Sequence, residues 1–215
     1  MATPITDKQF VARFYAAALA TQRSHGVPAL FTLAQHLTEQ GRNLTPPGNM
    51  CFGIKAGPAW KGKRQLLRTW EVHPKPTGYP YPEIISVTPY GTGRWKYVVR
   101  DWFRAYDTIE GSYADHAVFL KQNRRYAKAF QHPNDPVAFA KEIAAAGYAT
   151  DPDYFAKLKA AIAQLKKWEP STQPGPALVA SSSPASPSTS SPGKPAADSK
   201  PGAELAPISQ PGAGK

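Results

Sequence analysis

The sequence is poor in several features that mark particular protein classes. It has a single cysteine, Cys51, which excludes an internal disulfide and a cysteine-rich zinc site. No stretch reaches the roughly 20 consecutive apolar residues of a membrane-spanning helix, and the first residues lack the basic and apolar segments of a standard secretory signal. The five histidines show no close ligand spacing. We therefore expect no metal site, no cofactor and no membrane span.

Aromatic residues are absent from the last part of the chain. All 24 of them lie before residue 169, whereas residues 169–215 contain 10 Pro, 10 Ser, 8 Ala and 5 Gly. Such a segment cannot bury enough apolar surface to offset the entropy that it would lose on ordering. We therefore predict a folded domain over residues 1–168 and a disordered tail over residues 169–215.

Acidic residues are also scarce, at 15 against 26 Lys and Arg, and the net charge is +11. The tail carries three residues of each sign, so the excess positive charge belongs to residues 1–168. A basic body attracts polyanions, which include nucleic acid, an anionic membrane and a bacterial cell wall. Composition alone does not choose among them.

The hydrophobic pattern predicts an α+β fold in which a small antiparallel sheet interrupts a helical body. Apolar residues recur at helical spacing in the first part of the chain, and cap residues open three later helices. The predicted helices cover residues 7–24, 28–40, 107–130, 136–146 and 152–167, with caps at Asp7, Asp107, Asp135 and Asp151. Three β-favouring runs between Pro- and Gly-rich turns predict strands at 64–72, 83–90 and 95–103.

Glu39 has an unusual position within this pattern. It is the only acidic residue between Asp7 and Glu71, and it falls in the last turn of a predicted helix. There the helix dipole disfavours an anion by roughly 0.3–1 kcal/mol, which favours the neutral carboxyl. If a cleft also desolvates the carboxyl, its pKa rises, as a general acid requires. The alternative is a solvated glutamate on the outer face of the helix.

Several motifs, in order along the chain, resemble one enzyme family. TLAQHLTEQG, followed by GNMCFGIKAG, is similar to a signature in which a catalytic glutamate stands four residues after a glutamine. FRAYDTIEGSYADHAVFL and GYATDPDYFAKL match two later blocks of the same family. The chain thus resembles the bacterial glucosaminidases of glycoside hydrolase family 73, which include flagellar peptidoglycan hydrolases, autolysins and phage lysins. The resemblance implies a lysozyme-like fold. One departure is Arg42, where the family usually has tryptophan.

The resemblance also implies functional residues. Glu39 matches the general acid, and Glu71 is our choice for a second carboxylate that acts as base or charge stabiliser, with Glu83 as the alternative. Tyr148 matches a tyrosine near the cleft, where it would position the N-acetyl sugar. The remaining matches would bind the glycan, although core or turn roles stay open for several of them. These candidates are Gln35, Asn49, Phe52, Lys55, Phe103, Arg104, Tyr106 and Tyr126.

These matches imply a peptidoglycan hydrolase, an endo-β-N-acetylglucosaminidase that needs no cofactor. Two alternatives stay open: a muramidase or lytic transglycosylase acting on the same polymer, and a non-catalytic cell-wall-binding domain. The expected partners are glycan strands and anionic wall polymers. We expect a monomer and no nucleic-acid partner, because no recognised nucleic-acid-binding module is present. We expect the protein to act in the periplasm or the extracellular cell wall. Because no signal peptide is seen, export would need a phage holin, a dedicated secretion system or an unknown route.

Overall fold

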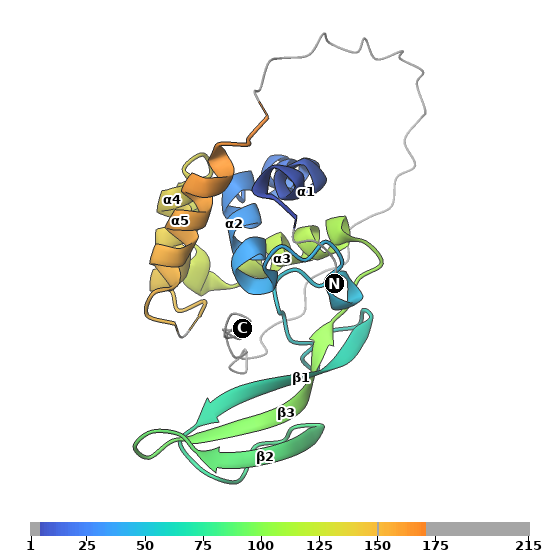
Figure 1. The fold of residues 1–215 in the computed structure, drawn as a ribbon, viewed down its shortest axis with the longest axis vertical. Helices are drawn as coiled ribbons and strands as arrows, with labels where there is room; N and C mark the ends of the chain where they lie inside the picture. Colours follow the sequence, from blue (N-terminus) through green and yellow to red (C-terminus); the bar gives the residue numbers. More distant parts are fainter. Residues whose placement is uncertain (1–4, 150, 171–215) are drawn as a thin grey trace, which may run out of the picture. The chain divides into compact units, whose positions relative to one another are not determined.

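The computed structural model describes residues 5–149 and 151–170 (Figure 1). The predicted tail lies almost entirely outside these residues. Within them the chain forms a helical body into which a three-stranded sheet is inserted, and this confirms the predicted α+β class. The helices are α1 (Asp7–His25), α2 (Ala29–Gln40), α3 (Ile109–Gln122), α4 (Pro136–Ala145) and α5 (Tyr154–Lys166). Short 3₁₀ turns occur at Pro47–Asn49, Arg124–Tyr126 and Ala129–Gln131.

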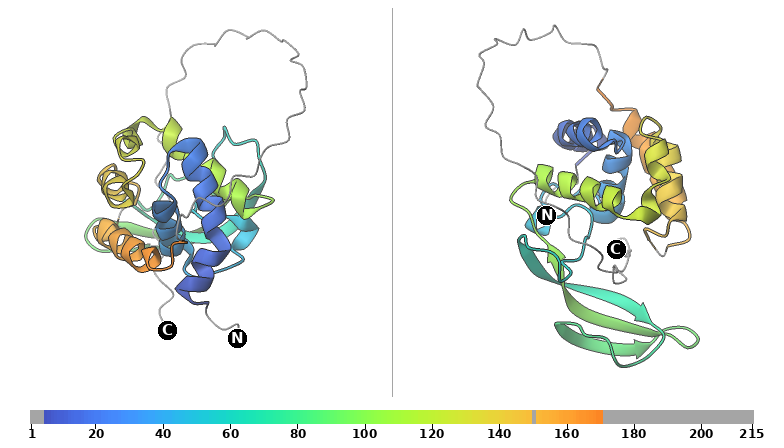
Figure 2. Two further views of the ribbon diagram at one scale, coloured as in Figure 1. Left: turned by 90° about the horizontal axis from the view of Figure 1, so that it is seen from above. Right: turned by 180° about the vertical axis from the view of Figure 1, so that it is seen from behind.

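Helix α2 occupies the centre of the helical body. It packs against α1, α4 and α5, while α1 also packs against α3 (Figures 1 and 2). Its first eight residues, Ala29 to His36, are all buried, so only its last turn reaches the surface. The core around it is rich in aromatic rings, and Phe31, for example, lies 4.7 Å from Phe139 between ring centroids. This packing fixes the position of the end of α2, where Glu39 lies.

The inserted sheet is antiparallel, with strand order β1-β3-β2. The strands are β1 (Arg64–His73), β2 (Glu83–Pro89) and β3 (Trp95–Arg104), close to the three predicted runs. Glu71 pairs with Tyr97 across β1 and β3. Figures 1 and 2 show β1 and β3 joining the sheet to the helices at one end, with β2 along the outer edge.

Two contacts fix the sheet to the helical body. Lys55, in the loop after the first 3₁₀ turn, forms an isolated antiparallel bridge with Phe103 of β3. Arg104, at the end of β3, pairs with Asp115 of α3 at 3.0 Å between Nη1 and Oδ2. Both ends of this ion pair are mostly buried, with side-chain exposures of 13% and 18%.

Several predicted helix ends were wrong by a few residues. Thr6 caps α1 and Thr108 caps α3, each by accepting a backbone hydrogen bond, in place of Asp7 and Asp107. Asp135 caps α4 as predicted, whereas α5 begins at Tyr154 without a side-chain cap. The helix predicted to run to Phe130 ends at Gln122. Two separate 3₁₀ turns follow it. Short acceptors one residue apart compete for the same backbone donors, so the sequence does not settle which one caps.

Candidate active site

Glu39 lies in the last turn of α2, next to the final residue of the helix. Gly41 ends the helix with φ 63° and ψ −151°, a backbone conformation that favours glycine. Its N–H donates to the Leu37 carbonyl at 2.9 Å. The chain therefore turns away soon after Glu39, and the carboxyl stays at the end of a helix whose earlier residues are buried.

The Glu39 carboxyl is held by a tyrosine from α5. The Tyr154 hydroxyl donates to Oε1 of Glu39 at 3.0 Å, and it accepts a hydrogen bond from Nε2 of Gln35 at 2.8 Å. Because Gln35 supplies a donor to Tyr154, the tyrosine hydrogen is directed toward Glu39. Gln35 is completely buried and Tyr154 is 4% exposed, so the relay Gln35–Tyr154–Glu39 is fixed by packing.

The environment of Glu39 favours its neutral form. Burial raises the pKa of Glu39 to about 8, although the hydrogen bond from Tyr154 acts in the opposite direction. Its second oxygen, Oε2, has no hydrogen-bond partner in the described part of the chain and is not among the fully buried unpaired atoms. That oxygen is therefore accessible from outside. A carboxyl that is protonated near neutral pH and has one accessible oxygen can deliver a proton to a bound substrate.

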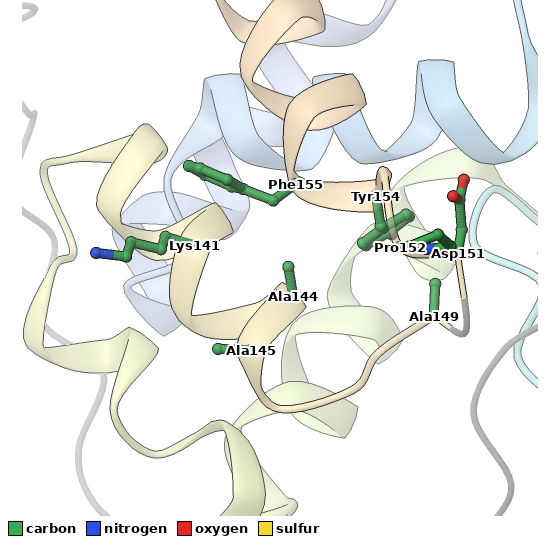
Figure 3. A pocket seen from close by; sticks show the side chains of 8 residues that line it. All are labelled: Lys141, Ala144, Ala145, Ala149, Asp151, Pro152, Tyr154 and Phe155. Atoms are coloured by element: carbon green, nitrogen blue, oxygen red, sulfur yellow. The ribbon is translucent and has the colours of Figure 1, made fainter.

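Tyr148 is completely buried and does not hydrogen-bond Glu39. Its hydroxyl donates to the Phe52 carbonyl at 3.5 Å, and its ring stacks on Tyr154 with centroids 5.9 Å apart. Tyr154 also lines a hollow of about 420 Å³ between the end of α4 and the start of α5 (Figure 3). The tyrosine that touches the candidate acid is therefore Tyr154, six residues after the one singled out from the sequence.

Glu71 lies on β1 and belongs to a charged cluster. Its Oε1 is 2.7 Å from Nζ of Lys55, and the same ammonium is 2.9 Å from Oδ2 of Asp101 on β3. All three side chains are less than a fifth exposed. Burial lowers the pKa of Lys55, but the two carboxylates raise it more, so its net shift is upward. Lys55 thus stays charged between two carboxylates and fixes the position of Glu71.

Aromatic side chains surround this cluster. Lys55 Nζ lies 5.7 Å from the centroid of the Tyr81 ring, and the Tyr81 hydroxyl is 2.5 Å from Nε2 of His73. His73 in turn stacks on Tyr79, with ring centroids 3.6 Å apart. Burial, followed by the nearby Glu71 and Asp101 charges, raises the pKa of Tyr81 and keeps it protonated. Glu71 therefore lies beside rings of the kind that contact sugar faces.

Glu83, the alternative second carboxylate, is in a different setting. It begins β2 and lies 3.3 Å from Nε of Arg100, with about half of each side chain exposed. An exposed ion pair of this kind contributes little stability and leaves the carboxylate solvated. The structure therefore favours Glu71 over Glu83 as the second carboxylate.

Most of the predicted glycan-binding residues have structural contacts. Phe52 and Tyr126 are fully buried and Phe103 is 3% exposed, so the direct glycan contact predicted for them is not supported.

The polar candidates form hydrogen bonds within the protein. Nδ2 of Asn49 donates to the Tyr106 and Asp107 carbonyls at 3.0 and 2.9 Å. Arg104 and the Tyr106 hydroxyl both hold Asp115. Tyr106 also lines a small hollow beside Trp60, so it keeps some access to a ligand.

Cys51 does not supply an alternative nucleophile. Cys51 is completely buried and burial raises its pKa to about 12, so its thiol is not a nucleophile near neutral pH. Among the described residues no group of three or more His, Cys, Asp or Glu side chains could hold a metal ion. In the same residues no helix is long and apolar enough to cross a membrane.

Comparison with known families identifies the domain. Residues 15–167 match the Glucosaminidase family model, described as mannosyl-glycoprotein endo-beta-N-acetylglucosaminidase. The chain belongs to this family. The match includes α2, the whole sheet and α5. It therefore contains Glu39 and Glu71 together with the residues that hold them.

Individual relatives agree with this assignment. The chain is 33% identical to the peptidoglycan hydrolase FlgJ of Salmonella typhimurium over 74% of its own length and 46% of that protein. It is 30% identical to FlgJ of Vibrio cholerae over 73% of its own length and 43% of that protein. The glucosaminidase chain thus spans less than half the length of these curated relatives.

Solved structures show the same fold. A peptidoglycan hydrolase mutant from Sphingomonas sp. A1 superposes with a TM-score of 0.58 and 34% identity, covering 75% of this chain and 97% of that one. The glycoside hydrolase domain of Salmonella typhimurium FlgJ gives a TM-score of 0.56 at 29% identity, covering 76% and 90%. The catalytic domain of a Listeria monocytogenes autolysin matches in fold, at 0.57 and 21% identity.

Two functional candidates were missed in the sequence. Tyr154 stands in the motif GYATDPDYFAKL, but nothing in its spacing distinguishes it from Tyr148. Asp101 of β3 lies opposite Leu67 of β1. It contacts Lys55 only because the two strands pair in this register. In the observed register Asp101 and Glu71 lie on one face of the sheet, but the sequence alone does not show that β1 pairs with β3.

Proposed function

We infer that this protein is a peptidoglycan hydrolase, an endo-β-N-acetylglucosaminidase in which Glu39 is the general acid. One observation carries the proposal: in a glucosaminidase-family domain, the carboxyl at the end of α2 is desolvated and held by Tyr154, and its second oxygen is open. Peptidoglycan is the substrate class named for the relatives in Salmonella and Sphingomonas.

The proton-transfer step follows from the two oxygens of Glu39. With Oε1 occupied by Tyr154, the proton resides on Oε2 and is delivered to the glycosidic oxygen as the bond to the anomeric carbon breaks. The departing sugar leaves with that proton. Tyr154 then stabilises the carboxylate that forms, because a hydrogen bond to a charged acceptor is stronger than one to a neutral acceptor.

Glu71 is the proposed second carboxylate. Positive charge develops at the anomeric carbon, and a fixed carboxylate either stabilises it or activates the attacking water. Oε1 of Glu71 is held by Lys55, while its Oε2 has no partner in the described residues and is not fully buried. Lys55 therefore acts as a positioning residue for Glu71, in place of the direct glycan contact predicted from the sequence.

The wider setting is also part of the proposal. The protein acts as a monomer on glycan strands in the periplasm or cell wall, and its net charge of +11 favours anionic wall polymers. Residues 1–168 are the catalytic domain and residues 169–215 a dispensable tail. Delivery by a phage holin or a dedicated secretion system would bring the enzyme to its substrate.

The decisive experiment is digestion of purified peptidoglycan by the wild-type protein, Glu39→Gln and the matched control Glu110→Gln. Glu110 is an exposed glutamate on α3. We expect wild type and Glu110→Gln to release soluble fragments with reducing-end N-acetylglucosamine, and Glu39→Gln to lose activity while keeping its circular dichroism spectrum. Reducing muramic or anhydro-muramic ends would show that the bond is assigned wrongly. Wild-type activity in Glu39→Gln would remove Glu39 from the mechanism.

A further inference from the structure

The sheet has a second face, on the side opposite to Glu71, that is basic and aromatic. Directly paired residues of antiparallel strands share a face, and the pairs on this face include Arg68 with Arg100 and Trp70 with Val98. We define the basic face by its four cations and two indole rings. These residues are Arg64, Arg68, Lys96, Arg100, Trp70 and Trp102.

Cation–aromatic contacts hold two of these cations in place. The Arg64 guanidinium lies 4.1 Å from the Trp102 ring centroid, and Lys96 Nζ lies 4.8 Å from the Trp70 ring centroid. Such contacts restrict long side chains that would otherwise be mobile. The cations of the basic face are therefore partly pre-ordered before any ligand arrives.

The positive charges on this face are under-compensated. Arg68 and Arg100 lie directly opposite each other across β1 and β3, an arrangement of like charges that costs stability. Glu83 pairs with Arg100 at 3.3 Å. Within residues 5–149 and 151–170, Arg64, Arg68 and Lys96 form no ion pair with a carboxylate. A face on which three of the four cations lack a counter-charge among the described residues suits an external anion.

The three arginines of the basic face are exposed to solvent. Figures 1 and 2 show the strands extending beyond the helices, and no helix packs closely on the sheet within the described residues. Arg64 and Arg68 are four residues apart on one strand, which corresponds to about 13 Å at the usual rise of a β-strand. A single small anion cannot meet both, whereas an extended polymer with repeated anionic groups can.

We propose that the basic face binds peptidoglycan outside the cleavage site by pairing its arginines with the free carboxylates of the peptide stems. This proposal rests on the proposed function, because the same polymer is then held on one face of the sheet while Glu71 meets the glycan on the other. Guanidinium groups match carboxylates in a two-point geometry. The indole rings provide apolar area against the sugar rings.

The test measures binding in a Glu39→Gln background, so that the polymer is not digested. Sacculi stripped of attached polymers are sedimented with three proteins. The first is Glu39→Gln alone, the second also carries Arg68→Gln/Arg100→Gln, and the third instead carries Arg23→Gln/Arg124→Gln. The last pair removes the same charge from exposed positions on the helical body. We expect the basic-face pair to weaken binding about tenfold, as loss of two charge-assisted contacts implies, and the control pair to change it little.

Chemical modification of the sacculi tests which group is bound. Amidation of the stem carboxylates should reduce binding of the Glu39→Gln protein to the level of the basic-face variant. The proposal would be overturned if the basic-face variant and the control variant bound sacculi equally well. It would also be overturned if the Glu39→Gln protein bound amidated sacculi as well as untreated ones. So would tighter binding to vesicles of anionic phospholipid or to double-stranded DNA than to sacculi at the same salt concentration.

A separate readout distinguishes failure of this inference from failure of the proposed function. With Glu39 intact, Arg68→Gln/Arg100→Gln should digest intact sacculi more slowly at low enzyme concentration but cleave short soluble peptidoglycan fragments at the wild-type rate. Wild-type digestion of sacculi by this variant would refute the basic face alone. Carboxylate-dependent binding without any cleavage by the wild-type protein would refute the proposed function alone.

Discussion

The Tyr154 hydroxyl donates to Glu39 Oε1 at 3.0 Å, across 115 positions of sequence. This contact joins α5 to the exposed end of α2, the two helices between which the candidate acid is held. The same hydroxyl accepts from the buried Gln35, so its hydrogen has one direction available. An acid with one oxygen fixed and one free presents its proton on a defined side.

Tyr154→Phe should therefore impair catalysis more than Tyr148→Phe. The phenylalanine keeps the buried ring but removes the donor to Glu39, and we expect a loss in kcat of about tenfold, within the range for one lost hydrogen bond to a reacting group. Tyr148→Phe removes a hydroxyl that reaches only the Phe52 carbonyl, at 3.5 Å. Steady-state rates on soluble peptidoglycan, with melting temperatures of both variants, make the comparison. A larger rate loss in Tyr148→Phe would favour Tyr148, the tyrosine singled out from the sequence, over Tyr154.

The pH profile gives a second readout for the same pair. The Tyr154 hydrogen bond lowers the pKa of Glu39 from the value that burial alone would give. Its removal should raise that pKa, so the alkaline limb of the rate profile should move to higher pH in Tyr154→Phe. In the wild type the limb should fall near pH 8, since the acid must be protonated to act. An unshifted limb in Tyr154→Phe would mean that Tyr154 does not act through Glu39.

Glu39→Gln should change stability in a pH-dependent way. The pKa of Glu39 is about 8 in the folded protein, against an ordinary value of 4.5 for a solvated glutamate, so the folded form binds the proton more tightly. Its contribution to stability is complete below pH 4.5 and is lost as the pH rises through 8. Glutamine has no such loss. We expect Glu39→Gln to gain about 1–3 kcal/mol relative to wild type between about pH 5 and pH 9, after allowance for partial exposure.

Thermal unfolding at about pH 5 and pH 9 measures this difference, since the two values bracket most of the window. Glu110→Gln is the control, because its exposed carboxylate should give the same small change at both values. If the melting temperature of Glu39→Gln differed from wild type by the same amount under the two conditions, the carboxyl would not be desolvated in the folded protein.

The sheet and the family could be predicted from the sequence, because both depend on local patterns. Short β-favouring runs between Pro- and Gly-rich turns indicated three strands within about one residue of their observed ends. Glu39 could also be singled out, since an isolated acid in the last turn of a helix is a local feature. The ordered motifs around it then pointed to the glucosaminidases.

The partners of the two carboxylates could not be predicted in the same way. Tyr154 reaches Glu39 only because α5 packs on α2, and Lys55 reaches Glu71 only through a bridge between a loop and β3. Both contacts depend on tertiary packing between distant segments. For the same reason Phe52 and Tyr126, which match family motifs, are buried in the core rather than exposed to a ligand.

Lys55→Met should weaken both the sheet and the reaction. The substitution leaves Glu71 and Asp101 close together without their shared ammonium, and we expect a loss of about 1–3 kcal/mol in unfolding free energy at neutral pH. Lys63→Met is the control, because its ion pair with Asp107 is largely exposed. Urea unfolding at neutral pH measures the effect.

A second substitution separates stability from activity at this site. Lys55→Met/Asp101→Asn removes one of the two facing carboxylates and should recover part of the stability lost in Lys55→Met. Activity should remain low, because Glu71 has lost the group that positions it. Full recovery of kcat in the double variant would show that Lys55 serves the fold and not the reaction.

His116→Phe should make the protein less sensitive to acid. His116 is completely buried and stacks on Phe52 with ring centroids 3.8 Å apart, and burial lowers its pKa from 6.5 to about 3. Between these two values the unfolded chain takes up a proton that the folded protein excludes, so stability falls as the pH falls through this window. Phenylalanine retains the stacked ring and removes the proton uptake.

The melting temperature of His116→Phe should therefore fall less than that of wild type between about pH 7 and pH 4. His132→Gln, a substitution outside the buried core, should follow wild type over the same range. If His116→Phe and wild type lost the same number of degrees, the acid sensitivity would arise elsewhere. His36 would then be the next residue to test, since burial also lowers its pKa to about 3.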